Sequence, residues 1–211
     1  MSKYKCIIFD CDGVLIDSEP IAIGVLVEMA NYLGANMELD AAMIALKGKS
    51  FKYCTNYISQ RIEKPLPIHF EQDYRINTFE AFRKNIQPIK GIKAVLENIN
   101  VPFCVASSGP ENKIRLNLEL TGLLPFFEGH IFSCYAIQKW KPEPDVFLWA
   151  AETMGFKPED CLVVEDSLSG VRAANTGGFD VFGYTEHDYG NALSKEATKT
   201  FNSMDKLLKM L

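Results

Sequence analysis

Residues 5–13 read KCIIFDCDG, a short apolar run that stops at two aspartates and a glycine. An unbroken apolar run of this length is typical of a strand that is buried on both faces of a sheet. Gly13 permits the tight turn that takes the chain away from the strand. We therefore predict a buried strand over residues 5–9, with Asp10 and Asp12 at its carboxyl end.

Similar apolar runs recur along the second half of the chain. They are residues 103–106, 161–164 and 180–182, with a weaker one at 130–133. Helix-length segments lie between them at residues 92–97, 112–120, 145–154 and 169–175. This alternation predicts an α/β fold with a Rossmann-like parallel sheet, and ligands are expected at the carboxyl ends of its strands.

An early part of the chain breaks the alternation, because its apolar residues recur at helical spacing. The helical segments are residues 21–33, 41–46, 51–61 and 70–84. We predict an inserted α-helical domain over residues 18–85 and a discontinuous core domain over residues 1–17 and 86–211. The turn at 87–91, QPIKG, is expected to return the chain to the sheet.

The composition is that of a globular protein. The 211 residues are 47% hydrophobic and 23% charged, which excludes disorder and collagen-like repeats. The net charge of −5 argues against nucleic acid or an anionic membrane as a partner. No apolar stretch suits a secretory signal or a membrane span, so we expect a cytoplasmic protein, for which a monomer is possible. The six cysteines lack the spacing of a zinc site.

Four carboxylates are expected at the ends of two strands. Asp10 and Asp12 follow the first strand, and Glu165 and Asp166 follow the run at 161–164. A solvated loop and a helix cap are the structural alternatives for these acids. If all four converge, their charge favours a divalent cation, and oxygen-only ligands suit Mg²⁺.

Two further segments offer groups that suit a phosphate. Ser107, Ser108 and Gly109 precede a predicted helix, where hydroxyls and backbone N–H groups can donate to phosphoryl oxygens. The same residues are also typical of an ordinary turn. Lys141 lies in the segment WKPEP, residues 140–144, whose prolines stiffen the backbone. Its ammonium can offset phosphate charge, although a solvated lysine is the alternative.

In order and spacing these segments resemble the haloacid dehalogenase (HAD) superfamily of phosphotransferases. Residues 9–19, FDCDGVLIDSE, look like its first motif, and Ser107 looks like its second. Lys141 with the following prolines resembles the third motif, and residues 165–167, EDS, resemble the fourth. The resemblance covers nearly the whole chain. It implies a HAD-fold core, with the helical insert as the cap domain of that family.

A narrower resemblance concerns the substrate. Residues 107–113, SSGPENK, and 137–142, IQKWKP, are most similar to the 6-phosphogluconate phosphatase-like branch. The resemblance therefore implies a phosphatase that acts on a small phosphorylated metabolite of the sugar-phosphate class, for which 6-phosphogluconate is the model.

The family resemblance also implies catalytic roles. Asp10 is expected to attack phosphorus and form an aspartyl phosphate, while Asp12 acts as general acid and then as general base. Ser107 and backbone N–H groups are expected to bind the phosphoryl group, and the hydroxyl of Ser108 makes it a further candidate for this contact. Lys141 is expected to stabilise the charge that builds up during transfer.

The family's metal ligands are likewise implied by the resemblance. Mg²⁺ is expected to be bound by the Asp10 carboxylate, the Asp12 main-chain carbonyl and Asp166. Glu165 is either a further ligand or an acceptor that supports the site.

Other functions compete with this interpretation. β-Phosphoglucomutases share the four motifs but carry a cap-hinge histidine where this chain has Ala22, which favours a phosphatase. A dehalogenase needs no metal, whereas this chain retains Asp12 and the later acid pair. A signalling module phosphorylated on Asp10 is a third alternative, but receiver-like domains are shorter and lack an insert after the first strand.

Substrate choice is expected to lie in the helical insert, because the four motifs recognise only a phosphoryl group and a metal. Residues 47–50, KGKS, place two lysines, a glycine and a serine between two predicted helices. We expect Lys49 to bind the sugar part of the substrate. A solvated connection between helices is the alternative.

Overall fold

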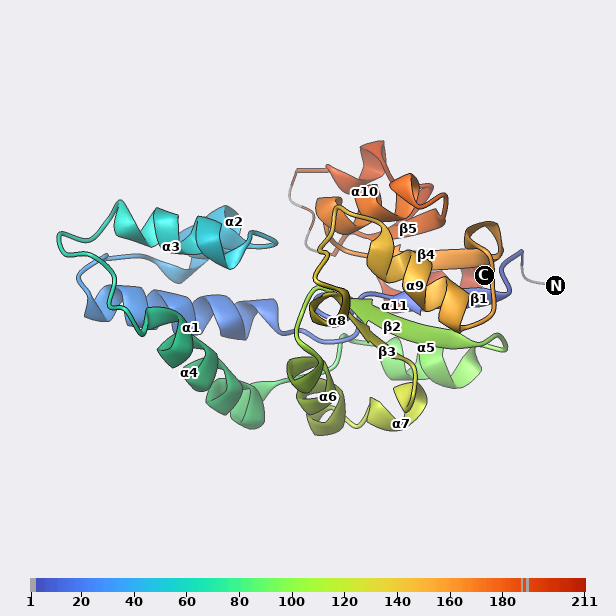
Figure 1. The fold of residues 1–211 in the computed structure, drawn as a ribbon, viewed down its shortest axis with the longest axis horizontal. Coiled ribbons are helices and arrows are strands. Elements are labelled where there is room, and N and C mark those ends of the chain that lie inside the picture. The colour runs from blue at the N-terminus through green and yellow to red at the C-terminus, as the bar shows by residue number, and fades with distance from the viewer. Residues whose placement is uncertain (1–2, 187, 189) are drawn as a thin grey trace. The chain divides into compact units, whose positions relative to one another are not determined.

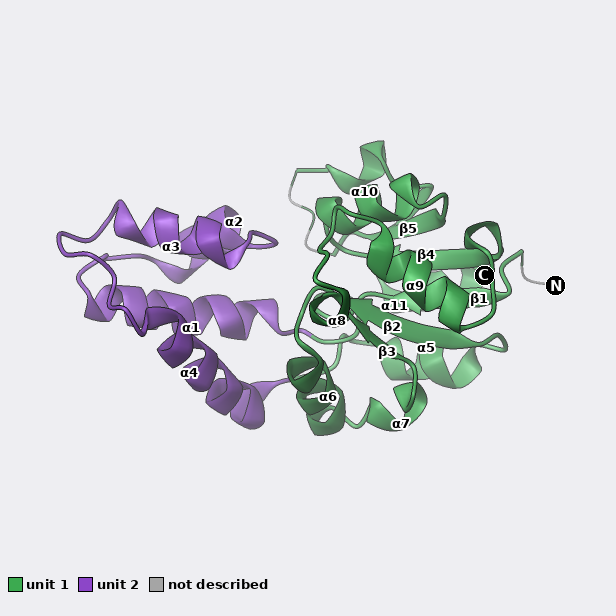
Figure 2. Cartoon of the chain, in the orientation of Figure 1, with its two compact units in different colours: residues 1–16, 87–211 green, residues 17–86 purple. Residues whose placement is uncertain are grey.

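The computed structural model describes residues 3–186, 188 and 190–211. Its backbone divides into two compact units, residues 1–16 with 87–211, and residues 17–86 (Figure 2). Asp17 and Ile86, which we expected in the core domain, thus belong to the helical unit.

The core unit contains a six-stranded sheet in the order β3-β2-β1-β4-β5-β6, and every neighbouring pair is parallel (Figure 1). The strands are β1 (Cys6–Phe9), β2 (Phe103–Ser107), β3 (Ile131–Ser133), β4 (Cys161–Glu165), β5 (Asp180–Tyr184) and β6 (Lys199–Phe201). The predicted parallel α/β fold is confirmed. The edge strand β6 was not predicted, because its short sequence KTF has two exposed residues and no apolar run.

Helices connect the strands of this unit. They are α5 (Ile92–Asn98), α6 (Glu111–Leu120), α7 (Leu124–Phe127), α8 (Cys134–Ile137), α9 (Asp145–Thr153), α10 (Leu168–Thr176) and α11 (Met204–Met210), with two short 3₁₀ helices at Pro158–Asp160 and Leu193–Lys195. Alternate residues of β1 serve the two faces of the sheet. Cys6 and Ile8 share a core cluster with Phe147 of α9, whereas Phe9 packs edge-to-face on Phe127 of α7. The central strand is therefore buried on both faces, as its sequence predicts.

The helical unit has a separate core. Its helices are α1 (Glu19–Tyr32), α2 (Leu39–Leu46), α3 (Phe51–Ser59) and α4 (Phe70–Asn85). Apolar residues at helical spacing, among them Leu26, Ala30, Leu46 and Ile58, pack together in this unit. Ser50 caps α3, since its hydroxyl accepts a hydrogen bond from the Tyr53 N–H. Among the described residues, no helix has both the length and the apolar character that a membrane span requires.

Candidate active site

The carboxyl ends of three neighbouring strands bring the predicted site residues of the core unit together. Phe9 of β1 is in register with Val105 of β2 and with Val164 of β4. Asp10 directly follows β1, and its N–H donates to the Val164 carbonyl at 2.9 Å. Because parallel strands end at the same edge, the residues that follow each strand meet there.

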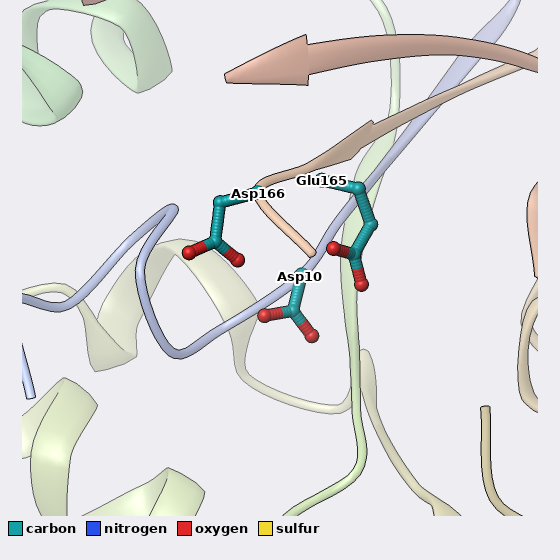
Figure 3. Close-up of side chains that lie close together, drawn as sticks. All are labelled: Asp10, Glu165 and Asp166. Carbon is teal, nitrogen blue, oxygen red and sulfur yellow. The ribbon is translucent and has the colours of Figure 1, made fainter. Parts of the chain in front are cut away.

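Three carboxylates form the centre of this edge. Each of Asp10, Glu165 and Asp166 offers an oxygen, and these oxygens all lie within 4.8 Å of one another. Figure 3 shows the three side chains turned toward a shared space. Asp10 and Glu165 are buried, and Asp166 is half-buried. A set of close carboxylate oxygens is the donor set that a hard divalent cation prefers, so these residues fit such an ion.

Lys141 lies between two of these acids. Its Nζ is 2.6 Å from Asp10 Oδ1 and 2.7 Å from Glu165 Oε1, and it also donates to the Ala106 carbonyl at 3.1 Å. The side chain is only 3% exposed. Burial acts to lower the pKa of Lys141, but the charges of Asp10 and Glu165 outweigh burial and leave that pKa above its ordinary value. The ammonium therefore stays charged.

The carboxyl group of Asp10 has a strongly raised pKa. Burial raises the pKa of Asp10 to about 7; Lys141 acts against this rise, and the neighbouring Glu165 adds to it. The carboxyl groups of Asp10 and Glu165 thus share one ammonium. A further cation beside them would favour the ionised form of Asp10, which is a second reason why the edge suits a cation.

Both carboxylate oxygens of Glu165 accept hydrogen bonds from neighbouring residues. Oε1 accepts from Lys141, and Oε2 accepts from the N–H of Ser167 at 2.7 Å and from its hydroxyl at 2.9 Å. The carboxylate lies against the first turn of α10, where a Cβ on Gly170 would be 1.7 Å from Oε1. Only a glycine at position 170 therefore leaves room for Glu165 in this orientation.

A second glycine makes room for Asp166. Gly13 has a φ of +86°, which disfavours other residues. A Cβ at this position would also be 2.0 Å from Asp166 Oδ2. The turn after β1 therefore requires a glycine for its backbone conformation and for the close approach of an acid from β4.

The end of β2 supplies the hydroxyl groups. Ser107 is buried, and its Oγ accepts from the Gly109 N–H at 3.1 Å, while Ser108 is exposed in the same turn. The turn is attached to β3, because the Ser133 hydroxyl donates to the Gly109 carbonyl at 2.7 Å. Two serines therefore lie at the same edge of the sheet as the acids.

Asp12 lies beside this serine turn and has an unforeseen partner. Lys113 of α6 places its Nζ 2.8 Å from Asp12 Oδ2. Lys113 lies in the stretch SSGPENK, and its sequence motif alone assigns it no role. A signal was present, because a lysine in the first turn of a helix opposes the helix dipole and so invites another explanation.

Lys49 belongs to the helical unit, apart from the other predicted site residues. It is exposed in the connection between α2 and α3, and its Nζ lies 5.6 Å from the centre of the Tyr53 ring. Its neighbours in this loop are fixed differently. Lys47 pairs with Glu19 of α1 at 3.1 Å, and the Gly48 N–H donates to the same carboxylate at 2.8 Å. These contacts tie the loop to α1 and leave Lys49 facing solvent within its unit.

Comparison with known proteins identifies the family. Residues 4–178 match the family model of haloacid dehalogenase-like hydrolases. The chain belongs to this family. It is 30% identical over 208 residues to 6-phosphogluconate phosphatase of Escherichia coli (strain K12), covering 98% of this chain and 94% of that protein. It is 26% identical to fructose-1-phosphate phosphatase YqaB of the same organism, covering 84% of this chain and 95% of that one.

A solved structure agrees with this assignment. A haloacid dehalogenase-like protein of unknown function from Agrobacterium tumefaciens superposes with a TM-score of 0.90 at 27% identity, covering 98% of this chain and 97% of that one. The predicted HAD fold and family are thus confirmed. The family and the phosphatase relatives also confirm the predicted class of enzyme, a phosphoric monoester hydrolase.

Proposed function

We propose that the protein is a Mg²⁺-dependent phosphatase that hydrolyses a small sugar phosphate through an aspartyl phosphate on Asp10. One observation carries the proposal: a buried aspartate ends the central strand, contacts a buried lysine and adjoins two further acids. A carboxylate in this setting is a nucleophile with a fixed position. The neighbouring ammonium and acids can stabilise the charge that develops during phosphoryl transfer.

The first step transfers the phosphoryl group to the enzyme. A carboxylate oxygen of Asp10 forms a bond to phosphorus while the bond from phosphorus to the sugar oxygen breaks. Asp12 gives a proton to that sugar oxygen, so that an alcohol leaves. Ser107, Ser108 and nearby backbone N–H groups bind the phosphoryl oxygens, and Lys141 stabilises the charge that gathers on them.

The second step releases phosphate. Asp12, now a carboxylate, takes a proton from water as the water oxygen attacks phosphorus. The bond between phosphorus and Asp10 breaks, and the free carboxylate returns to its contact with Lys141. Splitting hydrolysis in this way replaces one difficult displacement with two easier ones.

The proposed metal ligands are the Asp10 carboxylate, the main-chain carbonyl of Asp12 and the Asp166 carboxylate. Mg²⁺ held by these residues would supply positive charge that offsets the charge of the phosphoryl group. Both oxygens of Glu165 accept hydrogen bonds from Lys141 and Ser167, which supports a role for Glu165 as a fixed acceptor that positions Lys141 and not as a ligand.

The proposed substrate is a sugar phosphate similar to 6-phosphogluconate. Support comes from the relative named for that activity, which is matched over 98% of this chain. Lys49, on the cap, is the proposed contact for the sugar's own anionic or hydroxyl groups. The proposed location is the cytoplasm, because all six cysteines are unpaired, as is usual in a reducing compartment.

Replacement of the nucleophile tests the proposal. With Mg²⁺ present, Asp10→Asn should hydrolyse p-nitrophenyl phosphate and 6-phosphogluconate roughly 10³-fold more slowly than wild type, because an amide cannot form the phosphoenzyme. Asp205→Asn, on the exposed surface of α11, is the matched control and should keep wild-type rates. Circular dichroism checks that both variants fold.

Near-wild-type hydrolysis by purified Asp10→Asn would show that the nucleophile is wrongly assigned. The products separate a phosphatase from a mutase, since a phosphatase releases inorganic phosphate and a mutase yields an isomeric sugar phosphate. The alanine at position 22, where mutases of this type carry histidine, leads us to expect inorganic phosphate.

A further inference from the structure

The ion pair between Asp12 and Lys113 lies outside the roles described for the four motifs. Its atoms are 2.8 Å apart, although the two residues are 101 positions apart in the sequence. Each side chain is 24% exposed. A pair with this degree of shielding is screened less by solvent than a fully exposed pair.

The position of Lys113 in its own helix makes the contact more informative. Lys113 is the third residue of α6, which begins at Glu111. A cation in the first turn is unfavourable because the helix dipole is positive at that end. Lys113 therefore does not stabilise α6 through the helix dipole. The negative charge of Asp12 compensates this unfavourable interaction.

The surrounding backbone holds the pair close to the phosphate-binding serine. A Cβ on Gly109 would lie 3.7 Å from Asp12 Oδ2, 3.7 Å from Lys113 Cδ and 3.5 Å from Ser107 Oγ. All three side chains thus surround one glycine. Ser133 bonds the Gly109 carbonyl at 2.7 Å and so anchors this glycine to β3.

We propose that Lys113 is a positioning residue that orients the Asp12 carboxyl group for proton transfer; this inference rests on the proposed function. The ammonium donates to Oδ2 and fixes the plane of the carboxyl group, so that the transferred proton is carried on Oδ1. When Oδ1 gives its proton to the leaving sugar oxygen, Asp12 becomes a carboxylate. The nearby ammonium stabilises the negative charge that forms, and this interaction is stronger after the transfer than before it.

If Lys113 has this role, the effect of losing it should depend on how basic the leaving group is. A sugar alkoxide is strongly basic and needs a proton as it departs, whereas p-nitrophenolate is a weak base and departs without one. Loss of Lys113 should therefore slow the hydrolysis of alkyl phosphates more than that of p-nitrophenyl phosphate. A lysine that merely stabilises α6 would affect both esters equally.

The test compares kcat for the two kinds of ester at saturating Mg²⁺. The alkyl ester is whichever of 6-phosphogluconate, fructose 1-phosphate and glycerol 3-phosphate the wild type hydrolyses fastest. Lys113→Met should lower the ratio of alkyl to aryl kcat by about 10- to 100-fold, a typical share of general acid catalysis. The effect should fall on kcat and not on KM. Lys113→Arg keeps the charge and should restore part of the ratio.

Two further variants sharpen the comparison. Arg115→Met removes a cation from the same helix, where Arg115 pairs with Glu111 and Glu128, and should leave the ratio unchanged. Asp12→Asn should lower the ratio, and adding Lys113→Met to it should lower the ratio no further, because both changes remove the same proton transfer.

The outcomes separate this inference from the proposed function. If wild type hydrolyses both esters and Lys113→Met lowers both rates equally, or changes KM alone, the positioning role is wrong and the phosphatase stands. Additive losses in the double variant would overturn the role as well. If wild type hydrolyses neither ester, the proposed function fails and this inference fails with it.

Discussion

Glu165 and Asp166 are adjacent acids with different surroundings. Glu165 is 1% exposed and accepts hydrogen bonds at both oxygens from Lys141 and Ser167. Asp166 is half-buried and lies over Gly13 in the turn after β1. Successive side chains at the end of a strand point in different directions, which explains how neighbours reach different partners.

This difference leads to a prediction about metal binding. Asp166→Ala should raise the Mg²⁺ concentration needed for half-maximal activity by about 100-fold or more, because it removes a proposed ligand. Glu165→Gln should raise it by roughly 10-fold, since glutamine retains an acceptor and the loss is indirect. Isothermal titration of Mg²⁺ into each variant provides a readout that does not depend on turnover. Equal titration curves for wild type and Asp166→Ala would contradict the assignment.

At the scale of elements, the connection from β4 to α10 is held by several hydrogen bonds. Ser167 caps α10, because its hydroxyl accepts from the Gly170 N–H at 3.0 Å. The same hydroxyl donates to Glu165, so one serine joins the end of the strand to the start of the helix. A site built in this way has little freedom to shift.

Two glycine substitutions should therefore have opposite effects. Gly170→Ala should destabilise the protein by about 1–3 kcal/mol, because its Cβ would overlap the Glu165 carboxylate 1.7 Å away. Gly24→Ala, inside α1, should stabilise it by up to about 1 kcal/mol, because nothing lies within 4 Å and alanine favours a helix. Thermal unfolding measures both changes. A higher melting temperature for Gly170→Ala would refute the packing described here.

At the scale of the whole molecule, we propose that chemistry and substrate choice fall in separate units. The acids, the serines and Lys141 belong to the core unit, while Lys49 belongs to the helical unit with its own core. The core residues offer groups that suit any phosphoryl ester. We therefore expect changes in the helical unit to alter which ester is hydrolysed.

Lys49 provides the test of this division. Lys49→Ala should lower kcat/KM for 6-phosphogluconate by ~1–3 kcal/mol, the cost of one lost charged hydrogen bond. The loss should be much smaller for p-nitrophenyl phosphate, which lacks the sugar acid's carboxylate and hydroxyls. Lys52→Ala, an exposed lysine of α3, is the matched control. Equal losses on both esters would assign Lys49 to folding or phosphate binding, and no loss would leave it as a solvated loop residue.

Local sequence was sufficient to predict every strand of the sheet except β6, the helical insert and the residues at the strand ends. Apolar runs and helical spacing are contiguous signals, and the run KCIIF followed by DCDG already places two acids after a buried strand. The edge strand β6 was not predicted, because two of its three residues are exposed and it therefore lacks an apolar run. Tertiary structure alone showed the partners: Lys141 between Asp10 and Glu165, and Lys113 on Asp12. These contacts depend on strand register and on loops that meet from distant parts of the chain, and no spacing in the sequence encodes such distances.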